Sequence, residues 1–125
     1  LYMGLLKNNS KNLEKLYSDT FSIYRVITKD DGYGGTVEEE VLISENNRCR
    51  LSKATIKGSS NTPINSSEQE FKLFIPLTTE VLQNDRLEVH RGFSKYTARA
   101  SFPFKYYDII PHQEIVLKEV IENVD

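Results

Sequence analysis

The stretch Glu70–Leu77 reads Glu-Phe-Lys-Leu-Phe-Ile-Pro-Leu and indicates the fold most clearly. Its apolar side chains at Phe71, Leu73, Ile75 and Leu77 recur every second residue, which is the period of a β-strand with one buried face. Pro76 has no amide hydrogen to donate, so the strand is expected to end there or to lie at an edge. The chain is therefore expected to be built from half-buried strands.

The same alternation recurs on both sides of this stretch. Further strands are predicted at residues 21–28, 37–43, 48–52, 86–90, 95–102 and 114–121. Their inward-facing residues are expected to include Phe21, Ile23, Cys49, Leu51, Leu87, Val89, Ile115, Leu117 and Ile121. No helical segment of crossover length separates these strands, so a mainly β fold is expected rather than a parallel α/β sheet. About seven short strands indicate a small antiparallel β-barrel or sandwich.

The N-terminal segment has a different period. Leu6, Leu13, Leu16 and Tyr17 share one helical face, which predicts a short amphipathic helix over about residues 5–17. A chain of 125 residues is expected to form one domain. This domain divides into a helical segment at 1–18 and a β-barrel at 20–121, with a long flexible loop at 53–67.

Composition and charge exclude several classes of function. The net charge of -2 excludes a globally basic nucleic-acid binder, and the single cysteine, Cys49, excludes an intramolecular disulfide framework. The two histidines, His90 and His112, have no spacing typical of a zinc site. Since no local catalytic signature is present, we expect no enzyme, no metal and no cofactor.

The segment Lys53–Ser67 is long and polar. It contains Lys53 and Lys57 but no acidic residue, and only three of its side chains are apolar. Loops of this length are usually functional or disordered. Two interpretations stay open: a surface loop without function, and a segment that orders only against an anionic partner.

Two further charged segments have alternative interpretations. The acidic run Glu38-Glu39-Glu40 is typical of a solvated edge strand, while Glu38 and Glu40 could also contact Arg48 or Arg50 of a neighbouring subunit. The stretch from Arg86 to Tyr107 contains five basic residues and one acidic residue, Glu88, so its local charge is +4. Aromatic residues lie between the basic ones. Core packing explains such aromatic residues, whereas Tyr96, Arg99 and Phe102 could instead stack and neutralise single-stranded nucleic acid.

In the order of its strand and turn patterns, the chain resembles the small head-completion proteins of tailed phages and of PBSX-type defective prophages. The resemblance spans Phe21–Val120. It depends on Cys49-Arg50-Leu51-Ser52, the long polar segment, Asn84-Asp85-Arg86-Leu87-Glu88-Val89 and His112-Gln113-Glu114-Ile115-Val116-Leu117. Many of these proteins have glycine where Asn84 stands, and asparagine also tolerates the left-handed conformation.

The resemblance implies a β-barrel stopper, or head–tail connector. Its copies would form a ring between the portal or adaptor proteins and the tail of a phage particle, and isolated subunits could stay monomeric. The long loop would face the packaged double-stranded DNA in the channel through residues that match Lys53, Lys57, Gly58, Ser59, Ser60 and Asn61. The expected location is the phage-like particle, and the bacterial cytoplasm during assembly, with no membrane contact. A tail-completion or tail-terminator protein is the neighbouring alternative.

Overall fold

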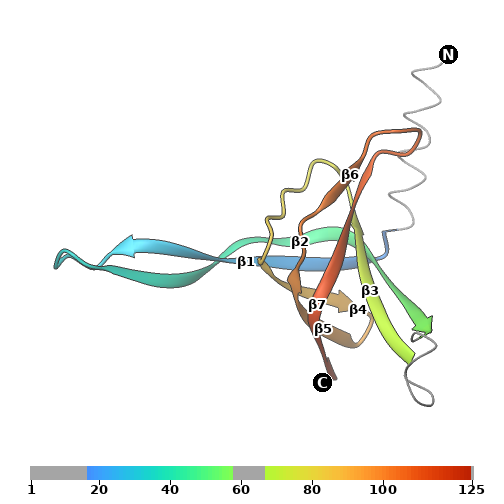
Figure 1. The fold of residues 1–125 in the computed structure, drawn as a ribbon, viewed down its shortest axis with the longest axis horizontal. Coiled ribbons are helices and arrows are strands. Elements are labelled where there is room, and N and C mark those ends of the chain that lie inside the picture. The colour runs from blue at the N-terminus through green and yellow to red at the C-terminus, as the bar shows by residue number, and fades with distance from the viewer. Residues whose placement is uncertain (1–16, 58–66, 125) are drawn as a thin grey trace.

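The computed structural model describes residues 17–57 and 67–124 and consists of β-strands in this part of the chain (Figure 1). Seven strands follow one another: β1 (Asp19–Asp30), β2 (Thr36–Lys57), β3 (Ser67–Ile75), β4 (Arg86–Arg91), β5 (Ser94–Ala100), β6 (Phe104–Tyr106) and β7 (His112–Val124). The mainly β class expected from the sequence is thus confirmed. Except for Tyr17, which is buried, the helix expected at 5–17 lies outside the described residues.

All strand pairs are antiparallel, and neighbouring strands follow the order β3-β2-β1-β4-β5-β7-β6. A further pairing between β3 and β7 brings the sheet back on itself. β6 pairs only with the beginning of β7, and the β1–β2 hairpin continues far beyond the other strands (Figure 1). The fold is therefore one curved sheet with projecting strands, and not the simple barrel or sandwich that was expected.

The two strands expected at 37–43 and 48–52 form the single strand β2. Asn46 has a left-handed φ of 58°, and the pairing with β1 shifts twice between Phe21 and Tyr24. Asn47 Nδ2 donates a hydrogen bond of 3.1 Å to the carbonyl oxygen of Phe21. Glu45 and Asn46 thus form a bulge opposite Ser22, and a bulge takes up an extra residue while the strand continues, so one strand replaces the two that were expected.

The core lies on the inner face of the curved sheet. Its buried residues are Phe21, Ile23, Cys49, Leu51, Leu73, Ile75, Val81, Leu87, Val89, Ala98, Ala100, Ile115 and Leu117. The predicted inward positions are confirmed except for Ile121, which is exposed, and Leu77, which follows the end of β3 and is only partly buried. Glu119 has a φ of 54°, and the pairing of β5 with β7 shifts between Thr97 and Arg99. The alternation therefore reverses before Ile121, and Val120 packs against the core instead.

Strands β2 and β3 extend further than the expected loop boundaries allow. The pairing between them runs from Arg50–Phe74 to Lys57–Ser67, so residues 53–57 and Ser67 belong to strands. The expected loop at 53–67 is wrong at these residues because pairing with a neighbouring strand satisfies their backbone groups although few of their side chains are apolar. Residues 58–66 lie outside the described part of the chain.

Candidate assembly interface

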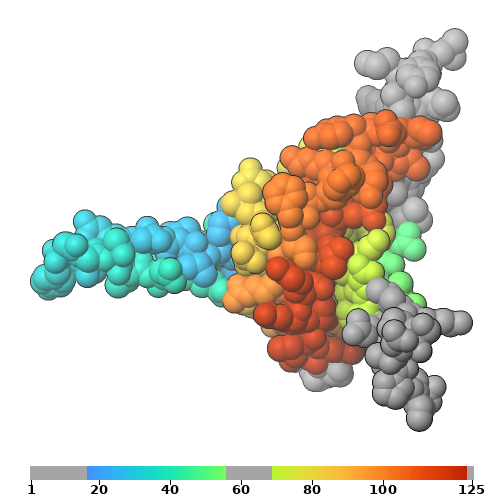
Figure 2. All heavy atoms as spheres, viewed as in Figure 1, coloured from blue at the N-terminus to red at the C-terminus, as the bar shows by residue number. Residues whose placement is uncertain are grey.

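The outer part of the β1–β2 hairpin, residues 26–42, stands away from the rest of the protein (Figures 1 and 2). We call these residues the arm. β4 pairs with β1 only as far as Tyr24, and β3 pairs with β2 only from Arg50 onward. Within the described part of the chain, both outer edges of the arm therefore lack a paired strand. A two-stranded ribbon on its own is only marginally stable in water.

Apolar side chains are exposed on both faces of the arm. The pairs Tyr24–Leu42, Val26–Glu40 and Thr28–Glu38 define one face, because directly paired residues point to the same side. We call it the outer arm face. Val26 is 49% exposed and Leu42 is 48% exposed on this face, and Val37 is 49% exposed on the opposite one.

The tip of the arm is a braced turn. Asp31 Oδ1 accepts hydrogen bonds from the backbone N–H groups of Tyr33, at 2.7 Å, and Gly35, at 3.0 Å. Gly32 and Gly34 both have a φ of 83°, which glycine adopts at little cost. Tyr33 is 95% exposed. The geometry of this turn presents one aromatic side chain to the solvent.

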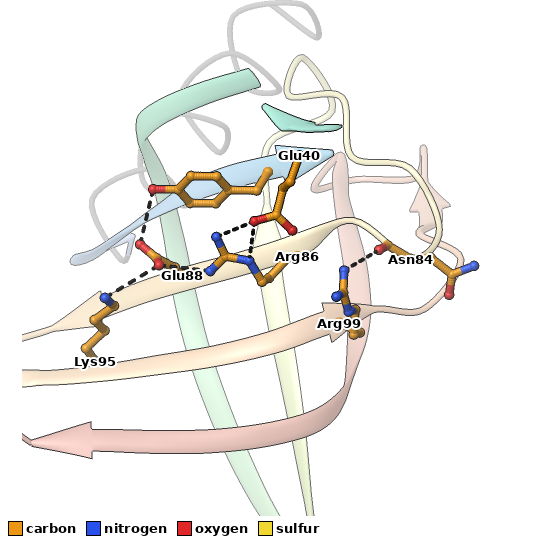
Figure 3. A network of polar contacts seen from close by, with 7 residues as sticks. Glu40, Asn84, Arg86, Glu88, Lys95 and Arg99 are labelled. Carbon is orange, nitrogen blue, oxygen red and sulfur yellow. Dashed lines mark hydrogen bonds and ion pairs between the residues drawn. The ribbon is translucent and has the colours of Figure 1, made fainter. Parts of the chain in front are cut away.

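Arg86 of β4 joins the root of the arm to the body on the outer side (Figure 3). Its guanidinium donates to Glu40 Oε1 at 2.6 and 2.9 Å and to Glu88 Oε1 at 2.9 Å. The same group lies 4.1 Å from the ring centre of Tyr24, a cation–π distance. Lys95 also lies 3.5 Å from Glu88. Glu40, one of the residues predicted at a subunit interface, therefore has a partner within its own subunit.

This ion-pair network changes the pKa values of its members. The hydrogen bonds from Arg86 hold the pKa of Glu40 below its ordinary value of 4.5 and raise the pKa of Arg86. Burial raises the pKa of Glu88, but hydrogen bonds and charge from Arg86 and Lys95 outweigh it, so the net shift is downward. Both carboxylates are thus stabilised in their charged form.

We expect the Glu40–Arg86 pair to make stability depend on pH. Because the folded pKa of Glu40 is lowered, its contribution is complete above 4.5 and is lost as the pH falls through the folded pKa. Glu40→Gln should lower the free energy of unfolding by about 0.5–1 kcal/mol at pH 7, and this difference should vanish toward acid pH. Urea unfolding across this pH range measures it. Glu45→Gln, at an exposed position on the same strand, should show no such trend; equal pH profiles for both variants would contradict the assignment.

A second ion pair holds the arm from the other side. Arg25 donates from Nε and Nη2 to the two carboxylate oxygens of Asp85, each at 2.9 Å. Asp85 Oδ2 also accepts the backbone N–H of Leu82 at 2.8 Å. The side chain of Asp85 is 2% exposed, whereas that of Arg25 is 22% exposed. The preceding residue, Asn84, has a φ of 73°, which agrees with the left-handed conformation expected there.

The four predicted interface residues do not come together in one subunit. Glu38 lies on the arm, whereas Arg48 and Arg50 lie on the body, on the side of β2 that faces away from the core. Glu38, Arg48 and Arg50 have no ionic partner among the described residues. Their predicted contact between subunits remains a prediction.

The predicted DNA-facing residues lie at the other end of β2. Lys53 is exposed, with its Nζ 5.9 Å from the ring centre of Phe71, and Lys57 is the last residue of the strand. Gly58, Ser59, Ser60 and Asn61 lie outside the described residues. Glu70 of β3 pairs with Ala54, so it lies on the face of the hairpin opposite to Lys53, which pairs with Phe71. Counted over the paired residues 53–57 and 67–70, the two lysines and the two glutamates cancel, so the positive charge inferred from the segment 53–67 alone is not a net charge of this end of the hairpin.

The alternative nucleic-acid face does not form a common platform. Tyr96 of β5 packs against the core and lies 5.8 Å from the ring of Phe71. Arg99 points to the opposite side of β5 and donates to the carbonyl oxygen of Asn84 at 3.3 Å (Figure 3). Phe102 follows the strand and is 74% exposed. An odd number of positions separates Tyr96 from Arg99, which places them on different faces of the strand.

Two surface features were missed by the sequence interpretation. The first is a row of rings on the outside of the sheet, in which Tyr106 stacks on His112 at 4.9 Å and contacts Phe104 at 4.8 Å. The second is a groove of about 810 Å³ between residues 77–83 and 102–105. The short strand β6, which contributes to both, was not predicted because only Phe104–Tyr106 pair with β7.

Buried Gln113 was also missed as a structural residue. Its Nε2 lies 2.9 Å from the carbonyl oxygen of Pro76 and 2.7 Å from that of Thr79. A polar residue inside an apolar alternation is the only sequence signal of this role, because its partners lie more than thirty positions away. Gln113 thereby fixes the turn that forms one wall of the groove.

The described residues show no cluster of three or more His, Cys, Asp or Glu side chains that could hold a metal ion. Cys49 is buried, and burial together with the charge of Asp19 raises the pKa of its thiol, which keeps the sulfur protonated. In the same part of the chain, no helix is long and apolar enough to cross a bilayer.

Comparison with family models found none that matches this chain, and comparison with curated proteins also found no match. Among solved structures, the phage-like element PBSX protein xkdH from Bacillus subtilis is similar in fold, with a TM-score of 0.46 and 10% sequence identity. The similar region covers 80% of this chain and 92% of that chain. A likeness of this degree identifies neither a function nor a partner.

Proposed function

We propose that this chain is a non-enzymatic structural subunit of a tailed phage or phage-like particle, where its copies form a ring that connects the head to the tail. The observation that carries the proposal is the arm. Its two edges lack paired strands and both of its faces expose apolar side chains, within the described part of the chain. Such a ribbon gains most of its stability from a partner, which is typical of a protein that works in an assembly.

The two ends of the long strand β2 would have different roles in the proposed ring. The strand has 22 residues, so it is about 70 Å long at 3.3 Å per residue. It begins in the arm and ends at Lys57, on the opposite side of the body (Figure 1). The arm would join the subunits to one another, while Lys53, Lys57 and residues 58–61 would face the DNA in the channel.

Electrostatic attraction to DNA would come from the repetition of subunits around the ring. The paired residues 53–57 and 67–70 contain two lysines, Lys53 and Lys57, and two glutamates, Glu68 and Glu70, so this end of one subunit has no net charge. A ring places many such ends around one axis, and weak contacts between lysine and phosphate then add through multivalency. An isolated subunit should accordingly bind DNA weakly.

Deletion of residues 58–65 in particles that contain this protein tests the proposal. DNA-filled particles should be lost because the channel is no longer closed, while the folded body is retained. The measurements are the fraction of DNA-filled heads by electron microscopy and the fraction of heads that carry tails. Phe93→Ser, in the exposed turn between β4 and β5, is the matched control and should assemble normally. Unchanged DNA retention together with unchanged tail attachment would show that the loop does not have this role.

The same particles separate the connector from its neighbouring alternative. A connector should be recovered with DNA-filled heads that lack tails, because it binds the portal or an adaptor protein. A tail-completion protein should be recovered with free tails and be absent from such heads. Immunoblots of the two purified fractions distinguish these outcomes.

A further inference from the structure

We propose that the outer arm face of one copy docks on the outer face of β2 and β3 of a second copy, where Arg48 and Arg50 lie beside Phe74. This inference rests on the proposed function, since it identifies the surfaces through which the copies would meet. We call Arg48, Arg50, Lys72 and Phe74 the arginine face. Arg50 and Phe74 are directly paired across β2 and β3, and Arg48 and Lys72 lie two residues away on the same side.

The outer arm face has apolar surface and one unmatched acid. Arg86 of the same subunit holds Glu40 and packs on Tyr24. Val26 and Leu42 remain about half exposed, and Glu38 has no ionic partner among the described residues. These three side chains are therefore available to a second molecule.

The arginine face has the complementary chemistry. Arg48 and Arg50 are exposed, and in the described part of the chain neither forms an ion pair. Lys72 has only a distant carboxylate, Glu114 at 3.9 Å. Phe74 is partly exposed between these cations, with its ring 6.0 Å from that of His112. On docking, Glu38 with its neighbours Val26 and Leu42 would therefore meet the cations of the arginine face and the ring of Phe74.

The overall charge distribution favours the same arrangement. The arm contains one basic residue, Lys29, and five acidic residues. These are Asp30, Asp31, Glu38, Glu39 and Glu40, so the net charge of the arm is -4. The described residues outside the arm carry a net charge of +1, and residues 43–57, which include Arg48 and Arg50, contribute +3 to it. The arm of one copy is thus attracted to the body of another, whereas two arms repel one another.

The contact cannot form within one subunit. Glu38 and Arg50 lie on the same strand, twelve residues apart, which corresponds to about 40 Å. Each copy therefore offers its arm to one neighbour and its arginine face to another. Such a contact is heterologous, so it repeats and produces a ring or an open filament.

Disulfide formation between introduced cysteines tests this arrangement without removing the charges. Thr28 is paired with Glu38 on the outer arm face, and Ser52 is paired with Lys72 beside the arginine face. The variant with Thr28→Cys and Ser52→Cys should give a ladder of covalent oligomers under mild oxidation. The two positions are too far apart to link within one chain, because a disulfide requires Cα atoms less than about 7 Å apart. Cys49 should give no background because it is buried.

A matched control places the cysteine on the other face of the same arm. The variant with Val37→Cys and Ser52→Cys should give no ladder, because Val37 is paired with Lys29 on the opposite face. Charge reversal then tests the chemistry: Glu38→Arg or Arg50→Glu, added to the Thr28–Ser52 cysteine variant, should each lower the yield of oligomers about tenfold, which corresponds to 1.4 kcal/mol. The combined reversal should restore the yield.

Several results would overturn the docking arrangement. Dimers from Thr28→Cys alone would indicate arm-to-arm contact. A ladder that forms equally from the variant with Val37→Cys and Ser52→Cys would indicate that the arm docks through its opposite face. Absence of any ladder would also overturn it. If the ladder is absent while the wild-type protein still retains DNA in particles, only the docking assignment fails. If the ladder forms but the protein is absent from heads and tails, the proposed function fails and the docking assignment stands.

Discussion

Asp85→Ala is expected to lower the free energy of unfolding by about 3 kcal/mol. The carboxylate is almost fully buried and accepts three hydrogen bonds, two from the guanidinium of Arg25 and one from the backbone N–H of Leu82. Its removal leaves a half-buried cation and a backbone donor without an acceptor. The cost stays below the upper end for a fully buried pair because Arg25 can regain part of its hydration.

Urea unfolding at pH 7 measures this effect. Asp108→Ala, at an exposed position, is the control and should change the free energy of unfolding by less than about 0.5 kcal/mol. Asp85→Asn separates charge from shape: it keeps an acceptor for Leu82 but loses the charge, so its effect should lie between those of Asp85→Ala and the wild type. An Asp85→Ala protein within 1 kcal/mol of the wild type would show that the ion pair does not anchor the arm.

Gln113→Leu is expected to cost about 2–4 kcal/mol. Leucine has a similar volume but no donor, so the carbonyl oxygen of Thr79 loses its hydrogen bond from Gln113, and that of Pro76 keeps only the one from the backbone N–H of Thr79, at 3.3 Å. Each unsatisfied buried group costs about 1–3 kcal/mol, partly offset by the better burial of an apolar side chain. The loss of stability should be concentrated in residues 76–82, which form the turn that the side chain of Gln113 holds in place.

Hydrogen exchange and urea unfolding together test the role of Gln113. Amide protection should fall first around Val81 and Leu82, before the strands β3 and β7 lose theirs. The matched control is Gln69→Leu, at an exposed position in β3, which should leave both measurements near wild type. Loss of stability without this local pattern would indicate a general packing defect instead.

The sequence predicted the strands better than their connections. Alternation identified the inner face of β3 and β4 correctly because one buried face imposes a period of two on a strand. The continuity of β2 was not predictable, since Asn46-Asn47 is compatible with a turn and with a bulge, and only pairing with β1 decides between them. The exposure of Ile121 has the same origin, because the irregularity at Glu119 reverses the alternation.

The candidate site was predictable only in part. The acidic run Glu38-Glu39-Glu40 was predicted to lie in an edge strand, and among the described residues this part of β2 pairs on one side only. The partner of Glu40 could not be predicted, because Arg86 lies forty-six positions away and meets it through the pairing of β1 with β4. Tyr96 and Arg99 were grouped by their proximity along the chain, whereas the alternation of the strand separates them.

The acidic side chains of the arm also protect the free subunit. A long ribbon with open edges is a template for fibrillar growth, in which identical strands stack edge to edge without limit. Four excess negative charges on each arm oppose such stacking through repulsion between like molecules. The acidic side chains that would direct one specific neighbour to the arm would thus also keep the subunits from aggregating before they assemble.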